Sequence, residues 1–489
     1  SRPCFRRGPC EDGCERRMAA SRPAGSARRR KLSPVGRGWF RGLYEPEMKM
    51  PESIITATLY FDTLPSQSVL VETFEKHIWP LDRFSSTIVD EAFVPTGSPM
   101  DVAYHFAERD VEGPSAIDDY LQSVMASPLR RDRPLWQVTS LRARSGRSAV
   151  VVRIHHVISD GLGLLFAFLP TLSCDDGEVL PKIRLPAALL GKLAPPRSTS
   201  ARPRAAASAP KPGCFVGIFT SVRMFFRGVL SILTLKEDGE MAFNAPKSER
   251  KPFLKFSGRH VFTRLPPVPT SAIKAVGHAH GCTFNDAIMA ALAGGFRRYA
   301  IEKLQDAKVA EGKDCECKAF MLVGLPRPID QKNPSVSLKN NILTPIFRLP
   351  IGDPSPRSRL RAVVAMCGDL KSMSYLAGIR LTTGLVTGLA PIGLMRKIAS
   401  EAISKCSCNV SNLPLPDVPV RFAGQEMKDV QVLFVNNIPQ ITMLSYNGAL
   451  HWNIVCDPQR ISDPEAFGRF VLEEFQRLAE DADTTGGKS

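Results

Sequence analysis

The residues best suited to chemistry lie in one heptad, His155-His156-Val157-Ile158-Ser159-Asp160-Gly161. A histidine titrates near neutral pH, so it can take a proton from a hydroxyl or thiol and later return it. An aspartate close in the chain can hold the local backbone or fix the imidazole, and a glycine permits a tight backbone without a Cβ. The heptad therefore predicts a general base. The alternative is a pair of structural histidines that are hydrogen-bonded within the core.

The elements expected around the heptad would display it well. The apolar run over residues 149–152 is typical of a buried strand, so the heptad falls at the strand end or in the loop beyond, where reactive side chains are commonly placed. Residues 161–169 predict a helix directly after it. Upstream, Pro134-Leu135-Trp136 leads into a strand over residues 137–142, and Ser145-Gly146 forms a turn between the two strands.

The rest of the chain predicts two mixed α/β halves, residues 32–185 and residues 251–482, each of ordinary domain size. The periodicity predicts strands over residues 53–61, 258–265, 320–325, 441–446 and 449–456, and helices over residues 67–78, 115–126, 287–299 and 463–480. Residues 376–398, broken by Pro391, suit a surface helical hairpin. Asn447-Gly448 is typical of a tight turn between two strands.

The segment between the halves, residues 186–250, is basic and contains an almost continuously apolar stretch. Residues 186–213 are rich in Pro, Ala, Ser and Arg, which is typical of a linker. Within residues 214–235 the polar side chains share one helical stripe, formed by Thr220, Arg223, Arg227, Ser231 and Thr234. Because two arginines near a bilayer midplane are costly, we favour a helix lying in the membrane interface. The alternatives are packing on the protein body and a membrane span.

The net charge of +16 is confined to two segments. Residues 1–50 contain 13 Lys/Arg and 5 Asp/Glu, residues 191–236 contain 8 Lys/Arg and no acidic residue, and the remainder is balanced. Basic segments outside a neutral body can bind anionic lipid headgroups. Nucleic acid is not an expected partner, because the chain has no RNP, KH or zinc-finger pattern. We expect residues 1–31 to be a disordered extension and residues 483–489 to be a short tail.

The cysteines indicate a reducing, cytosol-facing compartment. Twelve cysteines in 489 residues are too few for a disulfide scaffold. The pairs Cys315/Cys317 and Cys406/Cys408 lack the spacing of a zinc site, so no metal is expected. The acid-free residues 18–30 are loosely like a transit peptide, which leaves plastid import as the weaker alternative.

The heptad resembles the HHxxxDG signature of CoA-dependent acyltransferases, and its surroundings resemble the wax ester synthase/diacylglycerol acyltransferase family. The ordered blocks that carry this resemblance are Lys31-Leu32-Ser33-Pro34, Arg83-Phe84-Ser85-Ser86, Pro134-Leu135-Trp136, Thr283-Phe284-Asn285-Asp286, Ser411-Asn412-Leu413-Pro414 and Ser445-Tyr446-Asn447-Gly448. Each block is weak alone, and the ordered set is strong. The chain departs from the family in its Ala/Pro/Arg-rich linker, its extended N-terminus and Phe284, where Val is common.

The resemblance implies a two-domain chloramphenicol-acetyltransferase-like α/β fold with mixed sheets and an active-site tunnel between the halves. It implies transfer of a long-chain acyl group from acyl-CoA, a co-substrate rather than a bound cofactor, to a fatty alcohol, a diacylglycerol or both. Such a transfer needs a base on the hydroxyl and donors on the developing oxyanion. Together with the basic segments, it favours the endoplasmic reticulum membrane or a lipid-droplet surface.

The resemblance also implies roles for the residues of the heptad. His156 matches the family's base, and His155 is expected to support the loop. Asp160 matches an aspartate that related folds use structurally, turned toward an arginine, and Arg327 is the candidate partner. Gly161 is expected to permit a tight backbone.

The other blocks carry two interpretations each. Asn285 either hydrogen-bonds to the oxyanion or substrate across the domain junction, or caps a helix. Asp286 either binds the substrate or, as we favour, completes a capping box with Thr283. Ser411 and Asn412 either line the acceptor side of the site or belong to an ordinary loop. For Pro134-Leu135-Trp136 a structural role is favoured.

Other functions remain alternatives. A related HHxxxDG acyltransferase could use a non-lipid acceptor, although the DFGWG motif of BAHD-type enzymes is absent and the predicted halves leave no stretch for the carrier domain that normally adjoins a condensation domain. A catalytically inactive lipid-surface adaptor on the same fold is the non-enzymatic alternative, and the intact heptad argues against it.

Overall fold

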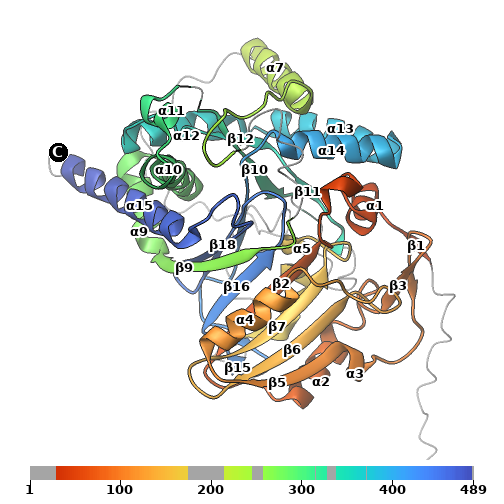
Figure 1. The fold of residues 1–489 in the computed structure, drawn as a ribbon. Helices are drawn as coiled ribbons and strands as arrows, with labels where there is room; N and C mark the ends of the chain where they lie inside the picture. The colour runs from red at the N-terminus through yellow and green to blue at the C-terminus, as the bar shows by residue number, and fades with distance from the viewer. Residues whose placement is uncertain are drawn as a thin grey trace, which may run out of the picture.

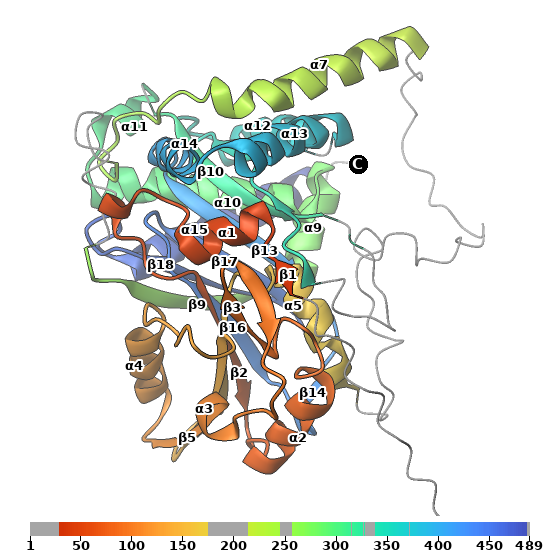
Figure 2. The same cartoon turned by 90° about the vertical axis from the view of Figure 1, so that its right-hand side faces the viewer.

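The computed structural model describes residues 29–174, 214–244, 257–313, 315–325, 327, 338–370 and 372–486. Linker residues 186–213 and nearly all of the predicted N-terminal extension lie outside this part. The chain forms two mixed α/β halves, each built on its own sheet, one above the other in Figures 1 and 2. The predicted fold class is confirmed.

The first sheet carries the heptad at the end of a central strand. Its strand order is β16 (Asp429–Phe434), β2 (Ile54–Phe61), β7 (Ser148–His155), β6 (Trp136–Ala143) and β5 (Phe106–Val111). All eight residues of β7 are buried, in keeping with the apolar run over residues 149–152. Helix α5 (Gly161–Phe168) follows the heptad, as predicted.

One strand of this sheet comes from the other half of the chain. β16, drawn in blue beside the orange and yellow strands in Figure 1, pairs antiparallel with β2 and places Val432 opposite Ala57. A three-stranded sheet also joins β14 (Arg421–Phe422) to β15 (Gln425–Glu426) and β8 (Leu172–Ser173). The structure therefore differs from the predicted division, which assigned all of residues 251–482 to the second half.

The second sheet supplies the opposite side of the site. Its strand order is β11 (Ile342–Leu343), β10 (Cys317–Gly324), β13 (Cys408–Pro414), β17 (Gln440–Tyr446), β18 (Ala449–Cys456) and β9 (Val261–Pro269), with β12 (Ile346–Leu349) also on β10. Asn447 and Gly448 have φ values of 46° and 74°, which confirms the predicted hairpin turn. Helix α10 (Phe284–Arg298) is buried, with twelve of its residues in the core.

The remaining elements surround these two sheets. Their bounds are β1 (Arg30–Lys31), α1 (Pro34–Arg41), η1 (Pro46–Met48), α2 (Gln67–His77), β3 (Ser86–Val89), β4 (Ala92–Pro95), α3 (Val102–His105), α4 (Pro114–Val124), η2 (Leu169–Thr171), α9 (Thr270–His280), η4 (Tyr299–Lys303), α11 (Ala307–Glu311), α12 (Pro356–Leu370) and α15 (Pro464–Gly486). Two expectations are wrong here. The end of the expected N-terminal extension is ordered, because β1 pairs with β4, and α15 extends into the expected C-terminal tail.

α7 (Cys214–Leu233) lies at the end of the molecule farthest from the first sheet, and α13 (Met373–Leu389) and α14 (Ile392–Ser404) lie below it at about the level of α11 and α12 (Figures 1 and 2). α13 and α14 are separated at Pro391, as predicted, but they do not pack against each other, so the expected hairpin is wrong: α13 packs on α7 instead. α7 packs against α13 so closely that a Cβ on Gly228 would lie 2.2 Å from the Tyr375 carbonyl oxygen. The inner face of α7 therefore packs on the protein body. None of the helices in the described part is long and apolar enough to cross a bilayer.

Candidate active site

The first histidine of the heptad belongs to strand β7. His155 is 1% exposed and pairs with Ile54 of β2. Its Nδ1 accepts a hydrogen bond from the Val157 N–H at 3.0 Å, and burial lowers its pKa to about 3. An imidazole that is buried, neutral and bonded to its own turn holds the backbone in place. This geometry fits the expected supporting role.

The second histidine lies just beyond the strand and lines a cavity. His156 stacks on Trp39, with ring centroids 4.4 Å apart and planes 19° apart, and Phe434 meets it edge-on at 5.6 Å. Its Nδ1 is buried and has no hydrogen-bond partner among the described residues. Burial is the largest influence on this imidazole and lowers its pKa, while Asp160 and the side chain of Asn340 act in the opposite direction. His156 is therefore neutral at neutral pH and can accept a proton.

The aspartate of the heptad holds the loop. Asp160 is the N-cap of α5, accepting the Gly163 N–H at 2.9 Å, and it also accepts the Asn341 N–H at 2.6 Å. Arg327 Nη2 reaches its two carboxylate oxygens at 2.8 and 2.9 Å, and the two side chains are 3% and 1% exposed. The expected Asp160–Arg327 pair is present and joins the two halves.

Two further side chains hold the backbone of the heptad. Arg83 donates to the carbonyls of Ile158 at 2.7 Å and Leu338 at 3.0 Å. Asn340 Nδ2 donates to the His156 carbonyl at 2.9 Å. In the sequence Arg83 belongs to one of the weak family blocks, and no local signal identifies Asn340, because its partner is 184 residues away.

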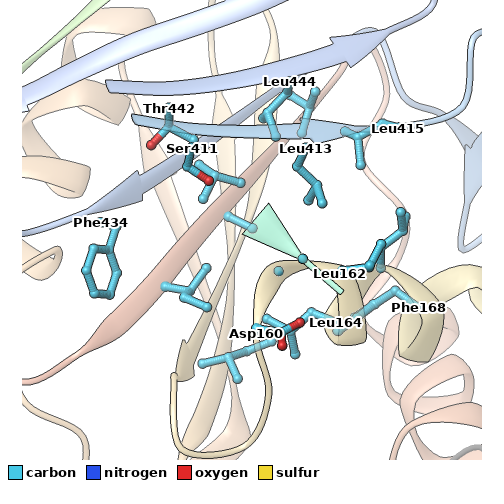
Figure 3. Close-up of a pocket in the computed structure, with 18 of the residues that line it drawn as sticks. Asp160, Leu162, Leu164, Phe168, Ser411, Leu413, Leu415, Phe434, Thr442 and Leu444 are labelled. Carbon is cyan, nitrogen blue, oxygen red and sulfur yellow. The ribbon is translucent and has the colours of Figure 1, made fainter. Parts of the chain in front are cut away.

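The cavity, of about 250 Å³, lies between the first sheet, α5 and strands β13 and β17 (Figure 3). Alternate residues of three neighbouring strands form one wall: Ile55, Ala57 and Leu59 of β2, Val152 and Ile154 of β7, and Val430, Val432 and Phe434 of β16. Leu162, Leu164, Leu165 and Phe168 of α5 form another wall. The cavity is therefore an apolar sleeve that His156 adjoins, and its first wall extends roughly 13 Å from Ile55 to Leu59 along the strand.

Polar side chains from β13 and β17 line another side. Ser411 and Thr442 are register partners, and Figure 3 shows their side-chain oxygens close together at the cavity. Two residues earlier on each strand, and therefore on the same face of the sheet, Asn409 pairs with Gln440. Gln440 Nε2 donates to Thr442 Oγ1 at 3.5 Å, which leaves the Thr442 proton available for another acceptor. Only Ser411 of these four was predicted. Strand alternation places Asn409 on the same face as Ser411, so the sequence could have indicated it. No such signal links Ser411 to the residues of β17, which belong to a distant segment.

The residues of the block Thr283-Phe284-Asn285-Asp286 have two different roles. Thr283 and Asp286 form the predicted capping box at the start of α10. Asn285 does not cap the helix. Its Oδ1 accepts a hydrogen bond from Asn412 Nδ2 at 2.8 Å, and Asn412, unlike Asn285, is among the residues that line the cavity. Asn285 therefore fixes a cavity residue by joining α10 to β13.

The block Pro134-Leu135-Trp136 is structural, as expected. Leu135 and Trp136 are 2% and 0% exposed. Trp136 Nε1 donates to the Phe84 carbonyl at 2.8 Å, and its backbone N–H donates to the Pro134 carbonyl at 2.9 Å. Its ring stacks on His105 with centroids 3.8 Å apart. The block thus anchors the start of β6.

The expected reason for Gly161 is wrong. Gly161 has no left-handed backbone conformation, and a Cβ there would meet Leu413 Cδ2 at 3.5 Å, an ordinary contact. Gly161 itself lines the cavity. A large side chain at this position would therefore extend toward the sleeve. No group of described residues is suited to holding a metal ion.

A histidine at the end of a central strand, beside a cavity between two mixed α/β halves, defines the class of condensation and chloramphenicol-acetyltransferase-like proteins. The chain belongs to the wax ester synthase/diacylglycerol acyltransferase family. Residues 92–288 match the model of the family's catalytic domain, and residues 338–479 match the model of its C-terminal domain. The protein is thus an acyltransferase of this type.

Individual relatives are distant. The chain is 25% identical to a probable diacylglycerol O-acyltransferase of Mycobacterium tuberculosis over 73% of this chain and 76% of that protein. It is 21% identical to wax ester synthase/diacylglycerol acyltransferase 3 of Arabidopsis thaliana over 84% and 88%. The structure resembles the wax ester synthase/diacylglycerol acyltransferase from Marinobacter aquaeolei VT8, with a TM-score of 0.59 and 15% identity over 93% of this chain and 100% of that one. It also resembles the first condensation domain of the CDA synthetase, with a TM-score of 0.55, 16% identity and coverages of 93% and 98%.

Proposed function

We propose that this acyltransferase moves a long-chain acyl group from acyl-CoA to a lipid alcohol, either a fatty alcohol or a diacylglycerol, with His156 as the general base. The observation that carries the proposal is a buried, neutral imidazole beside an apolar sleeve. The sleeve suits an acyl chain, because the walls formed by the first sheet and α5 offer aliphatic and aromatic side chains. The names of the relatives in Mycobacterium and Arabidopsis support these two acceptor classes.

In the proposed reaction, His156 takes the proton of the acceptor hydroxyl as its oxygen attacks the thioester carbon. The new oxygen–carbon bond forms, the carbon–sulfur bond breaks, and the imidazolium returns the proton to the departing CoA sulfur. The products are an ester and free CoA, and no covalent acyl-enzyme is required. The hydroxyls of Ser411 and Thr442 are suited to donate to the developing oxyanion, because both lie at the same cavity as His156.

The test uses the purified full-length protein with radiolabelled palmitoyl-CoA and either hexadecanol or dioleoylglycerol. We expect labelled wax ester, triacylglycerol or both, with one free thiol released per ester formed. The ratio of the two products identifies the preferred acceptor. A folded protein that forms neither ester would refute the lipid-acceptor proposal.

We also propose that the enzyme works at a cytosol-facing lipid surface, either the endoplasmic reticulum membrane or a lipid droplet, and docks through the outer side of α7 and α13. Large apolar side chains are exposed there in two helical stripes, 46–78% exposed: Phe219, Val222, Phe226 and Leu230 on α7, and Met373, Leu381, Leu385 and Leu389 on α13. The two helices contain Arg223, Arg227 and Arg380 and no acidic residue. Apolar stripes accompanied only by cations suit an anionic lipid surface.

Vesicle flotation tests this docking surface. We expect the wild type to float with vesicles of phosphatidylcholine and phosphatidylserine, and less well with phosphatidylcholine alone. The double variant Phe219→Glu/Phe226→Glu should remain at the bottom, because it places charges in the apolar stripe. Val89→Glu, at a position 48% exposed on β3, is the matched control and should float like the wild type. Equal flotation of the double variant and the wild type would refute this surface without affecting the chemistry.

A further inference from the structure

Trp39 of helix α1 covers one face of the His156 ring. The two rings are stacked at 4.4 Å and 19°. Phe434 meets both rings edge-on, at 6.2 Å and 90° to Trp39 and at 5.6 Å and 76° to His156. The plane of the imidazole is thus set by a face contact and an edge contact. Trp39 was not predicted, because 117 residues separate it from His156 in the sequence.

Helix α1 is held in place by contacts with both halves. Ser33 caps it, accepting the Gly36 N–H at 3.0 Å. Arg396 of α14 donates to the Gly42 carbonyl at 3.1 Å, just past its C-terminal end. Arg131 donates to the Phe40 carbonyl at 3.3 Å and lies 4.8 Å from the centre of that ring. These contacts fix the indole over His156.

The electrostatic surroundings of His156 make this stack important. A general base must carry a positive charge after it takes the proton, and burial opposes that charge. The titratable groups that act on the ring are Asp160, whose oxygens are occupied by Arg327 and backbone N–H groups, and the neutral His155. The uncharged Asn340 side chain also favours the protonated ring. The side chains that α1 and β16 bring to the ring, Trp39 and Phe434, are uncharged. An indole face is the best aromatic partner for a cation.

We propose that Trp39 is a positioning residue for His156, whose indole face fixes the imidazole plane and stabilises the imidazolium formed during acyl transfer. The proposal rests on the proposed role of His156 as general base. It differs from simple packing, because a cation–π contact favours the protonated ring over the neutral one, whereas packing alone does not distinguish between them.

Two substitutions separate these effects. Trp39→Leu removes the aromatic face, and Trp39→Phe keeps a weaker one. For Trp39→Leu we expect the histidine-dependent acid limb of kcat/KM to move down by about one pH unit, and kcat on the plateau to fall about tenfold. Trp39→Phe should show a smaller change of both. Trp79→Leu, which removes a half-buried tryptophan elsewhere, is the control and should leave both unchanged.

The direct readout is the NMR titration of His156 in histidine-labelled full-length protein, assigned with His156→Gln. Circular dichroism checks that each variant is folded. A lower titration midpoint in Trp39→Leu, in the absence of substrates, supports the proposal. An unchanged midpoint overturns it, even if kcat falls, because that result describes packing only. This titration needs no acyl transfer, so failure of the proposed function would appear separately, as full activity of His156→Gln.

Discussion

The buried Asp160–Arg327 pair offers the sharpest test of how the site is assembled. In Asp160→Asn, the amide oxygen can still cap α5, but the guanidinium loses the carboxylate that it contacts at 2.8 and 2.9 Å, while it still donates to the carbonyls of Lys339 at 3.2 Å and Asn341 at 3.5 Å. Breaking a buried ion pair by removing one partner costs about 3–5 kcal/mol. In Arg327→Met, the carboxylate keeps two backbone N–H donors at a helix N-terminus, so we expect a smaller loss, of about 1–3 kcal/mol.

The double variant Asp160→Asn/Arg327→Met removes both charges. It should therefore recover part of the stability lost in Asp160→Asn, since replacing a buried pair costs less than breaking it. Urea-induced unfolding followed by circular dichroism measures the three free energies. Both single variants should also lose acyl-transfer activity about a hundredfold, because a shift of about 1 Å in a catalytic group has this effect. Strictly additive losses, or a fully stable and active Asp160→Asn, would contradict this account of the loop.

Three further predictions concern neighbouring features. Burial lowers the pKa of His155 to about 3 and that of His105 to about 4, so the unfolded state binds more protons than the folded state below about pH 6.5. Each of these two histidines should therefore lower the free energy of unfolding by about 2 kcal/mol as the pH falls from 6.5 to 5. His105→Asn should flatten the pH dependence of the urea midpoint. Gly161→Leu should shorten the preferred acyl chain, raising the octanoyl-CoA to palmitoyl-CoA ratio of kcat/KM, and an unchanged ratio would exclude the sleeve as the acyl site. Asn285→Ala and Asn412→Ala should each cost about 1 kcal/mol and the double variant no more, whereas additive losses would show that their hydrogen bond is unimportant.

Features that depend on neighbouring residues could be predicted from the sequence. The heptad at a strand end, the capping box of Thr283 and Asp286, and the Asn447-Gly448 turn each rest on residues within a few positions of one another. The partnership of Asp160 with Arg327 spans 167 residues and was reached through the family resemblance rather than through local physics.

Features that depend on distant pairing could not be predicted. β16 joins the first sheet by pairing with β2, and nothing in its own sequence specifies that partner. Trp39 and Asn340 lie 117 and 184 residues from His156 in the sequence and meet it only in the tertiary structure. For α7, the periodicity revealed a polar stripe but not the packed face, which is determined by the close approach of Gly228 to α13.

The central claim is that His156 is the base for acyl transfer. Its most direct test is the steady-state rate of ester formation by His156→Gln and wild type, with acyl-CoA and the preferred alcohol at saturation and both proteins shown to be folded. His77→Gln, which replaces a partly exposed histidine of α2, is the matched control. We predict that His156→Gln is slower by about 10²–10⁴-fold and that His77→Gln is unchanged. Equal ester formation by His156→Gln and wild type would contradict the account.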